Sequence, residues 1–295
     1  MSRHSGALHT LTTPAGVLTF NPGDYSGDGL YLDLDGAQFG ADVRVARTSR
    51  PQAHGSYADN GFEDGVLGTM KGRILASTLA GRATLEDALL KCLRSTLGEE
   101  GTGTLAWTEP GSGTLRQIRG LQLVDRIHLV ADVGATMAFA FQLAAERSTA
   151  EGQTETTTSS DALTGTGGGL SFPKAFPWSF TGSAGGQVTV VNAGTATAYP
   201  VLRIYGAASA PVITHAASGK KLTFTGSVGA GDYLEVDLFE RTVKLNGTTN
   251  RLNLLDITNS QWFGLGVGSN IVRMAAGSFD ASARLDVVAR DAFTA

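Results

Sequence analysis

The sequence predicts a mainly-β protein of two domains, and three observations support that prediction. Apolar and polar residues alternate over many short stretches, which is the period of a half-buried strand. The 39 glycines and only 8 prolines favour short strands joined by tight turns. Residues 148–170 are rich in Gly, Thr and Ser and offer almost nothing to bury, so they are predicted to be a linker. We therefore expect one domain at 1–147 and another at 171–295.

The first predicted strands contain a pair of acidic residues. Residues 30–34 alternate up to Asp35-Gly36, a dipeptide typical of hairpin turns. Asp33 and Asp35 would lie on the same face of that strand, so paired acid/base carboxylates are one interpretation. We favour the simpler one, a solvated strand face that leads into a turn.

Residues 48–68 show little periodicity and are predicted to be a long loop. Loops of this length are usually functional or mobile. His54, Asp59 and Glu63 lie in it, but their spacing matches no known set of metal ligands. No metal site is predicted there.

One stretch, residues 84–97, has the periodicity of a helix. Thr84 and Asp87 form a weakened capping box at its start, and Gly98 is a natural end. Cys92 belongs to the apolar stripe, so we interpret it as a small buried hydrophobe and not as a nucleophile. A single helix packed on a sheet makes the first domain α+β. The apolar stripe consists of Leu85, Ala88, Leu89, Cys92, Leu93 and Leu97.

Strands are expected again after the helix. Arg116, Arg119 and Arg126 form a basic set among them, but without interleaved aromatic residues they are weak evidence for nucleic-acid binding. The last of these strands alternates aromatic and other apolar residues with small ones. The predicted strands are residues 104–107, 114–120, 121–130 and 135–144.

Two features of the predicted linker region invite a ligand interpretation. The glycine run 165–169 is not followed by the Gly-Lys-Ser/Thr that opens the helix of a phosphate-binding loop, so we reject a nucleotide site. The aromatic residues that follow could stack on a sugar, but a strand anchored in the second core is the favoured interpretation. They are Phe172, Phe176, Trp178 and Phe180.

Composition narrows the function classes further. The net charge is -4 and only 17% of residues are charged, so no strongly basic surface is expected. A single cysteine excludes an intrachain disulfide framework. No leader sequence or long apolar run is evident, and we expect a soluble protein made without export and without membrane insertion. The five histidines are scattered, and no catalytic, cofactor-binding or metal-binding residues are predicted.

The most informative motifs lie in residues 185–206. An alternating strand ends at the turn Asn192-Ala193-Gly194-Thr195, where Asn and Gly tolerate positive φ. Tyr199-Pro200 then leads into a second alternating strand, residues 201–205. Similar short strands and turns continue to the end of the chain and predict a β-sandwich. These later motifs are residues 211–213, 219–222, 228–237, 242–247 and 262–270.

In order and spacing these motifs resemble the distal tail protein (Dit) family of long-tailed, siphovirus-type phages. The resemblance implies a tail-tube-like β-sandwich with one helix in the first domain and a galectin-like antiparallel β-sandwich in the second. It also implies a ring, expected to be hexameric, at the distal end of the tail tube. Residues 48–68 would contact a neighbouring subunit.

The resemblance also implies partners and a place in the virion. We expect the ring to bind the tail tube protein on one side and tail-tip or baseplate hub proteins, including receptor-binding proteins, on the other. DNA would pass through the channel without specific binding. A structural role without catalysis or cofactors follows. Two alternatives stay open: a carbohydrate-binding adhesion module of the tail tip, and a tail-associated hydrolase.

Overall fold

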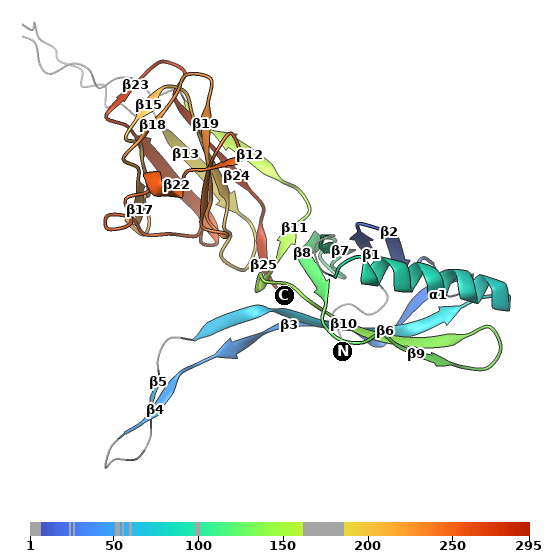
Figure 1. Cartoon of the computed structure of the whole chain (residues 1–295). Helices are drawn as coiled ribbons and strands as arrows, with labels where there is room; N and C mark the ends of the chain where they lie inside the picture. Colours follow the sequence, from blue (N-terminus) through green and yellow to red (C-terminus); the bar gives the residue numbers. More distant parts are fainter. Residues whose placement is uncertain are drawn as a thin grey trace, which may run out of the picture. The chain divides into compact units, whose positions relative to one another are not determined.

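The chain forms two compact units, one of residues 1–153 with 293–295 and one of residues 154–292. The computed structural model describes residues 7–23, 25, 27–50, 54, 56–58, 61–97, 101–161 and 186–295. The protein is mainly β, with a single α-helix in the described part of the chain (Figure 1). No helix among those residues is both long and apolar enough to cross a membrane.

The first unit is built on a ten-stranded sheet in the order β25-β11-β8-β7-β1-β2-β3-β6-β10-β9. A further pairing joins β8 to β10. The sheet from β8 to β10 is therefore closed into a ring of hydrogen-bonded strands. The strands are β1 (His9–Thr13), β2 (Gly16–Phe20), β3 (Gly29–Arg44), β6 (Phe62–Leu75), β7 (Gly103–Thr108), β8 (Leu115–Leu123), β9 (His128–Ala131), β10 (Met137–Ala144), β11 (Thr149–Gly152) and β25 (Ala292–Thr294).

Alternation places the aromatic residues of β10 in the core of this unit. Every second residue of the strand is buried, as the sequence pattern predicts. Phe139 and Phe141 lie 6.0 and 6.3 Å from the ring of Phe20, a spacing typical of packed aromatic pairs.

Helix α1 (Leu79–Arg94) begins and ends earlier than the predicted 84–97. Its N-cap is Thr78, whose Oγ1 accepts a hydrogen bond from the Gly81 N–H at 3.0 Å. The expected capping by Thr84 was wrong, because the first turn carries no apolar periodicity that would reveal it. The buried positions Leu89, Cys92 and Leu93 confirm most of the predicted apolar stripe, with Cys92 inside it. Leu97, the last predicted member, lies beyond the helix and is 45% exposed.

The described residues of the predicted loop at 48–68 lie mostly in strands of a long hairpin. Strands β3 and β6 run antiparallel past the body of the unit, and β4 (Arg47–Ser49) with β5 (Ser56–Ala58) continues the ribbon (Figure 1). The sequence pattern fails here because neither face of the ribbon is buried, so no alternation is required.

Asp35-Gly36 is not a hairpin turn, which corrects a second expectation. Strand β3 runs through these residues, and its register against β6 shifts between Leu32 and Ala37. A Cβ on Gly36 would lie 2.3 Å from the carbonyl oxygen of Lys71, so the shifted segment accepts only glycine there.

The second unit is a β-sandwich around one hydrophobic core. A six-stranded sheet has the order β12-β24-β14-β19-β20-β21, and a four-stranded sheet has the order β13-β22-β16-β17. Inward residues of both sheets, such as Ile204, Val236 and Val272, belong to the same buried cluster. The larger sheet comprises β12 (Thr156–Ser159), β14 (Val201–Tyr205), β19 (Tyr233–Asp237), β20 (Thr242–Leu245), β21 (Thr249–Asn250) and β24 (Arg284–Ala289); the smaller comprises β13 (Gln187–Asn192), β16 (Val212–His215), β17 (Lys221–Thr223) and β22 (Gly268–Ala275).

A small third sheet and a short 3-10 helix complete this unit. The sheet has three strands in the order β18-β15-β23. Its strands are β15 (Ala208–Ser209), β18 (Ser227–Val228) and β23 (Ser278–Phe279), and the helix is η2 (Leu252–Leu254).

The start of the predicted linker 148–170 is structured. Residues 149–152 form β11 and residues 156–159 form β12, which pairs with β24. Threonine is β-branched and suits an edge strand with little burial, so a low apolar content did not exclude strands here. Residues 162–170 and the aromatic residues Phe172, Phe176, Trp178 and Phe180 lie outside the described residues.

Candidate assembly surfaces

The outer part of the β3–β6 hairpin exposes apolar side chains on a two-stranded ribbon. Val43 is 64% exposed, Phe62 63% and Tyr57 60%. A two-stranded hairpin without a core behind it is at best marginally stable in water. Exposed apolar residues on such an element make it a candidate surface for contact with another chain.

One face of this ribbon is formed by Val43, Val45 and Glu63, and we call it the Val43 face. Val43 lies opposite Glu63 in the β3–β6 register, so their side chains share a face. A Cβ at Gly61 would lie 3.4 Å from Val43 and 3.3 Å from Val45, so both valines extend over this glycine. The result is a small apolar spot beside a carboxylate.

The opposite face of the ribbon carries an ion pair between its own two strands. Arg44 lies opposite Phe62, and its guanidinium pairs with the Asp64 carboxylate at 2.5 Å. Further out, the guanidinium of Arg50 lies 5.0 Å from the centre of the Tyr57 ring.

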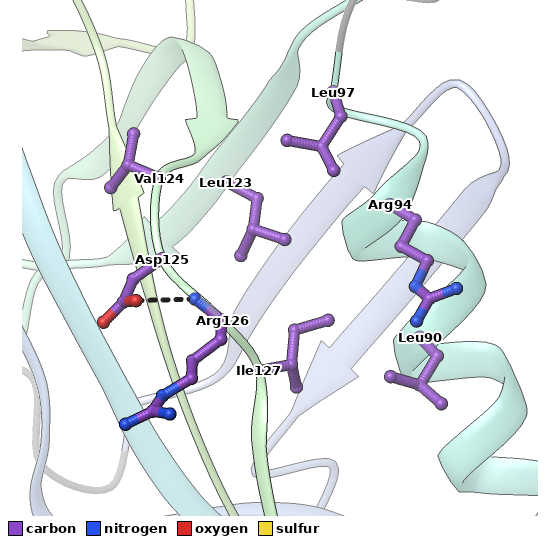
Figure 2. A pocket seen from close by; sticks show the side chains of 8 residues that line it. All are labelled: Leu90, Arg94, Leu97, Leu123, Val124, Asp125, Arg126 and Ile127. Atoms are coloured by element: carbon purple, nitrogen blue, oxygen red, sulfur yellow. Dashed lines mark hydrogen bonds between the residues drawn. The ribbon is translucent and has the colours of Figure 1, made fainter.

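A groove of about 560 Å³ lies in the same unit, between the end of α1 and the chain that leaves β8. The side chains of Leu90 and Leu97 on one wall and of Leu123 and Ile127 on the other point into the space between the walls (Figure 2). The other described residues of the lining are Val124, Asp125, Arg94 and Arg126. We call it the Leu97 groove.

The charged residues of the Leu97 groove differ in their partners. Arg94 belongs to the last turn of α1 and makes no ion pair with any described residue. The Asp125 carboxylate accepts the backbone N–H of Arg126 at 2.7 Å, and the Arg126 side chain turns away from the helix (Figure 2). The groove therefore has an apolar floor with a guanidinium on its helical wall.

In the second unit, the turn after β13 is organised by the buried side chain of Asn192. Its Nδ2 donates to the carbonyl oxygen of Ala196 at 2.8 Å, and its Oδ1 accepts the N–H of Gly194 at 3.1 Å. Asn192 is only 2% exposed, so these bonds replace water entirely.

His215 lies in a cluster that sequence reasoning missed. Its Nδ1 is 2.8 Å from Ser218 Oγ, its Nε2 is 3.2 Å from Asn270 Oδ1, and its ring stacks on Phe263. Ser218 follows three residues later, but Asn270 comes from β22 and has no local signal. The Asn270 amide also donates to the carbonyl oxygens of Gly266 and Gly268. These polar groups satisfy one another, which is the behaviour of a structural network.

An aromatic row crosses the outer face of the larger sheet. The rings of Tyr205 and Tyr233 lie 5.2 Å apart, and the guanidinium of Arg284 lies 4.2 Å from the Tyr205 ring centre. Arg203 and Glu235, in the next row, form an ion pair at 3.0 Å. Arg284 thus lies over one face of the Tyr205 ring, and Arg203 lies 5.9 Å from the centre of the Tyr233 ring.

The acidic residues and the histidine considered from the sequence form no cluster among the described residues. Asp35 pairs with Lys71 Nζ at 2.9 Å and not with Asp33. No group of three or more His, Cys, Asp or Glu that could hold a metal exists among the described residues. Asp59 lies outside them, and Glu63 belongs to the Val43 face.

The basic set is largely engaged with acidic partners. Arg119 pairs with Glu151 at 2.6 Å and Arg116 with Glu109 at 3.4 Å. Arg126 donates from Nε to His128 at 3.2 Å. These residues do not form a continuous basic stripe of the kind that binds a phosphate backbone.

Comparisons with known proteins support the resemblance found in the sequence. Residues 193–284 match the family model of the siphovirus-type tail component, C-terminal domain. No curated protein matches the chain in sequence. The chain is similar in structure to the SPP1 Dit (gp 19.1) protein, described as a paradigm of hub adsorption apparatus in phages that infect Gram-positive bacteria. The TM-score is 0.59 at 11% identity, over 97% of this chain and 99% of that one.

A second structural match is a chain of the phage P2 baseplate in its activated conformation with calcium. Its TM-score is 0.50 at 11% identity, over 97% of this chain and 98% of that one. The match to the family model confirms the Dit resemblance for most of the second unit, and the Dit-like fold extends over nearly the whole chain.

Proposed function

We propose that this chain, with its Dit-like fold and its siphovirus-type C-terminal domain, is a structural virion protein that forms a hexameric ring. The ring lies at the distal end of the phage tail tube and joins the tube to the tip or baseplate. The observation that supports this most directly is the likeness to SPP1 Dit over 97% of this chain and 99% of that one. Both units of the chain take part in that likeness.

The first unit has the features that ring formation needs. Its hairpin projects an apolar ribbon, and the Leu97 groove is a different surface of the same unit. Contacts between unlike surfaces are head-to-tail, and they close into a ring when the rotation between neighbours divides a full turn. The closed β-sheet between β8 and β10 supplies a rigid body for such contacts.

The charge of the chain is compatible with a channel for DNA. Six copies at -4 each carry 6 × -4 = -24, so a basic lumen that would retain phosphates is not favoured. We expect a neutral or negative lumen. A ring structure with Lys and Arg along its lumen would contradict that expectation.

The second unit is proposed to bind other tail proteins. Within it, a compact sandwich displays short loops and a charged, aromatic sheet face. Tip or hub proteins, and through them receptor-binding proteins, are the partners that fit this role. The tube protein would bind the ring formed by the first unit.

Native mass spectrometry of the full chain over a range of concentrations tests the ring. A six-fold mass is the expected result, and electron microscopy of virions labelled on this protein should place it at the distal tail end. A chain that stays monomeric at high concentration and gives no label on tails would overturn the proposal. A monomer in dilute solution with a labelled tail end would support assembly on the growing tail.

A further inference from the structure

We infer that the Val43 face of one copy docks into the Leu97 groove of the next copy, with Glu63 of the first paired to Arg94 of the second. This inference rests on the proposed ring and specifies which two surfaces form its interface. The occupant of the groove is thus a second copy of this chain.

The length of the hairpin supports contact with a whole neighbouring unit. The ten residues from 41 to 50, seven of which lie in β3 and β4, span about 33 Å when extended at roughly 3.3 Å per residue. A unit of this size has a radius of gyration of about 15 Å. The ribbon is therefore long enough to lie along a neighbouring copy.

Both surfaces present aliphatic side chains that can pack against each other. Val43 and Val45 form a patch on the ribbon, and the groove offers leucines and an isoleucine on both walls. Leu97 is 45% exposed and Val43 is 64% exposed, so each has apolar area still in contact with water. Covering both removes that area from water at a gain of roughly 25 cal/mol per Å².

The charges of the two surfaces are complementary. Neither Glu63 nor Arg94 has an ion pair with a described residue, and each lies beside its apolar patch. Lys91, one turn before Arg94, adds a second positive charge at this end of α1. The other face of the ribbon fits less well, because its Arg44 and Asp64 already neutralise each other.

The opposing charge in the groove does not change this conclusion. Among the described residues of the lining, Asp125 is the one acidic residue, and its carboxylate accepts the Arg126 N–H. Two arginines against one aspartate give the described residues of the lining a net charge of +1.

Reversing the charges one at a time and then together tests the pairing. Glu63→Arg or Arg94→Glu alone should weaken association between subunits by about tenfold or more, because each places like charges in contact. The double variant should recover association to within about threefold of the wild type. The measurement is sedimentation velocity or native mass spectrometry of the full chain over a concentration series.

The outcomes separate this inference from the ring itself. If the wild-type chain forms rings and neither single reversal changes them, or the double variant shows no recovery, the docking is wrong and the ring stands. If the wild-type chain forms no ring in solution or on tails, the proposed function fails first. Val43→Asp should disrupt rings, whereas Val191→Asp, at a 63% exposed valine of the second unit, should not.

Disulfide trapping gives an independent test that does not depend on affinity. With Val43→Cys and Leu97→Cys in one chain, mild oxidation should give a ladder of covalent oligomers up to the ring. The native Cys92 is buried and should contribute little background. Val191→Cys with Leu97→Cys is the matched control, and rings without a ladder from the first pair would overturn the docking.

Discussion

The side-chain oxygen of Asn192 accepts the backbone N–H of Ala292 at 3.1 Å, across a hundred residues of sequence. The Ala292 carbonyl in return accepts the N–H groups of Thr195 and Ala196 at 2.8 and 2.9 Å. The turn that begins at Asn192 is therefore fastened to the chain that follows β24. This contact explains why the turn has the sequence Asn-x-Gly-Thr, one of the motifs that resemble the Dit family.

Gly194 is the position where that contact is least tolerant of change. A Cβ there would lie 1.7 Å from the Ala292 carbonyl oxygen, so the backbone must move for any other residue. We expect Gly194→Ala to lower the free energy of unfolding of the second unit by about 3 kcal/mol or more, through strain and lost hydrogen bonds. Urea unfolding of the full chain measures it.

Gly266→Ala is the control for this change. No atom lies within 4 Å of a Cβ at Gly266, and we expect a change within about 1 kcal/mol in either direction. Equal effects of the two substitutions would show that the Gly194 contact is not the cause.

Sequence reasoning succeeded where burial imposes a period. The alternation of β10, β14 and β19 was predictable because one face of each strand is buried. It failed on the outer part of the hairpin, where the described residues from 48 to 63 meet solvent on both faces and no period is required. The β12 strand was missed for a related reason, since its threonines pair at a sheet edge without contributing to a core.

The candidate interface could be predicted only in part. A subunit contact at 48–68 was expected from the family resemblance, but the residues of the Val43 face depend on the β3–β6 register. The Leu97 groove joins the end of α1 to the segment after β8, and no local pattern links these two stretches. Long-range pairing of this kind is a property of the fold and leaves no spacing signal.

The two threonines at the start of α1 should respond oppositely to alanine. Thr78 caps the helix, so Thr78→Ala should lower the free energy of unfolding of the first unit by about 1 kcal/mol. Thr84 lies inside the helix and bonds back to the Ala80 carbonyl at 3.0 Å, so Thr84→Ala should be neutral or slightly stabilising. Chemical denaturation of both variants checks this. If Thr84→Ala destabilised the first unit more than Thr78→Ala, the result would support the predicted helix start at Thr84.

Lys71 should control the titration of Asp35. The hydrogen bond from Lys71 Nζ, chiefly, lowers the pKa of the Asp35 carboxyl below its ordinary value. Because the folded pKa is lowered, this pair stabilises the folded state above the unfolded pKa of about 3.9, and that contribution is lost as the pH falls through the folded pKa. Lys71→Met should raise the pKa of Asp35 to its ordinary value, measured by NMR of the carboxyl carbon.

Lys71→Arg is the control for the Asp35 titration, since it keeps a charged donor near the carboxylate. Asp35 should then titrate below its ordinary pKa, as in the wild type. An unchanged titration in Lys71→Met would show that the ion pair is not formed in solution.

Phe293 should stabilise the first unit although it follows the second in sequence. It is only 7% exposed in the first unit's core, and the guanidinium of Arg116 lies 4.4 Å from its ring centre. β25 joins β11 at one edge of the ten-stranded sheet. We expect Phe293→Ala to cost about 3 kcal/mol, and Phe293→Leu, which keeps apolar volume but loses the cation–π contact, about 1 kcal/mol. Hydrogen exchange should then show lost protection in β8 and β11 with β14 and β19 unchanged. Lost protection confined to β14 and β19 would instead assign the last residues to the second unit, as the predicted boundary at 171–295 implied.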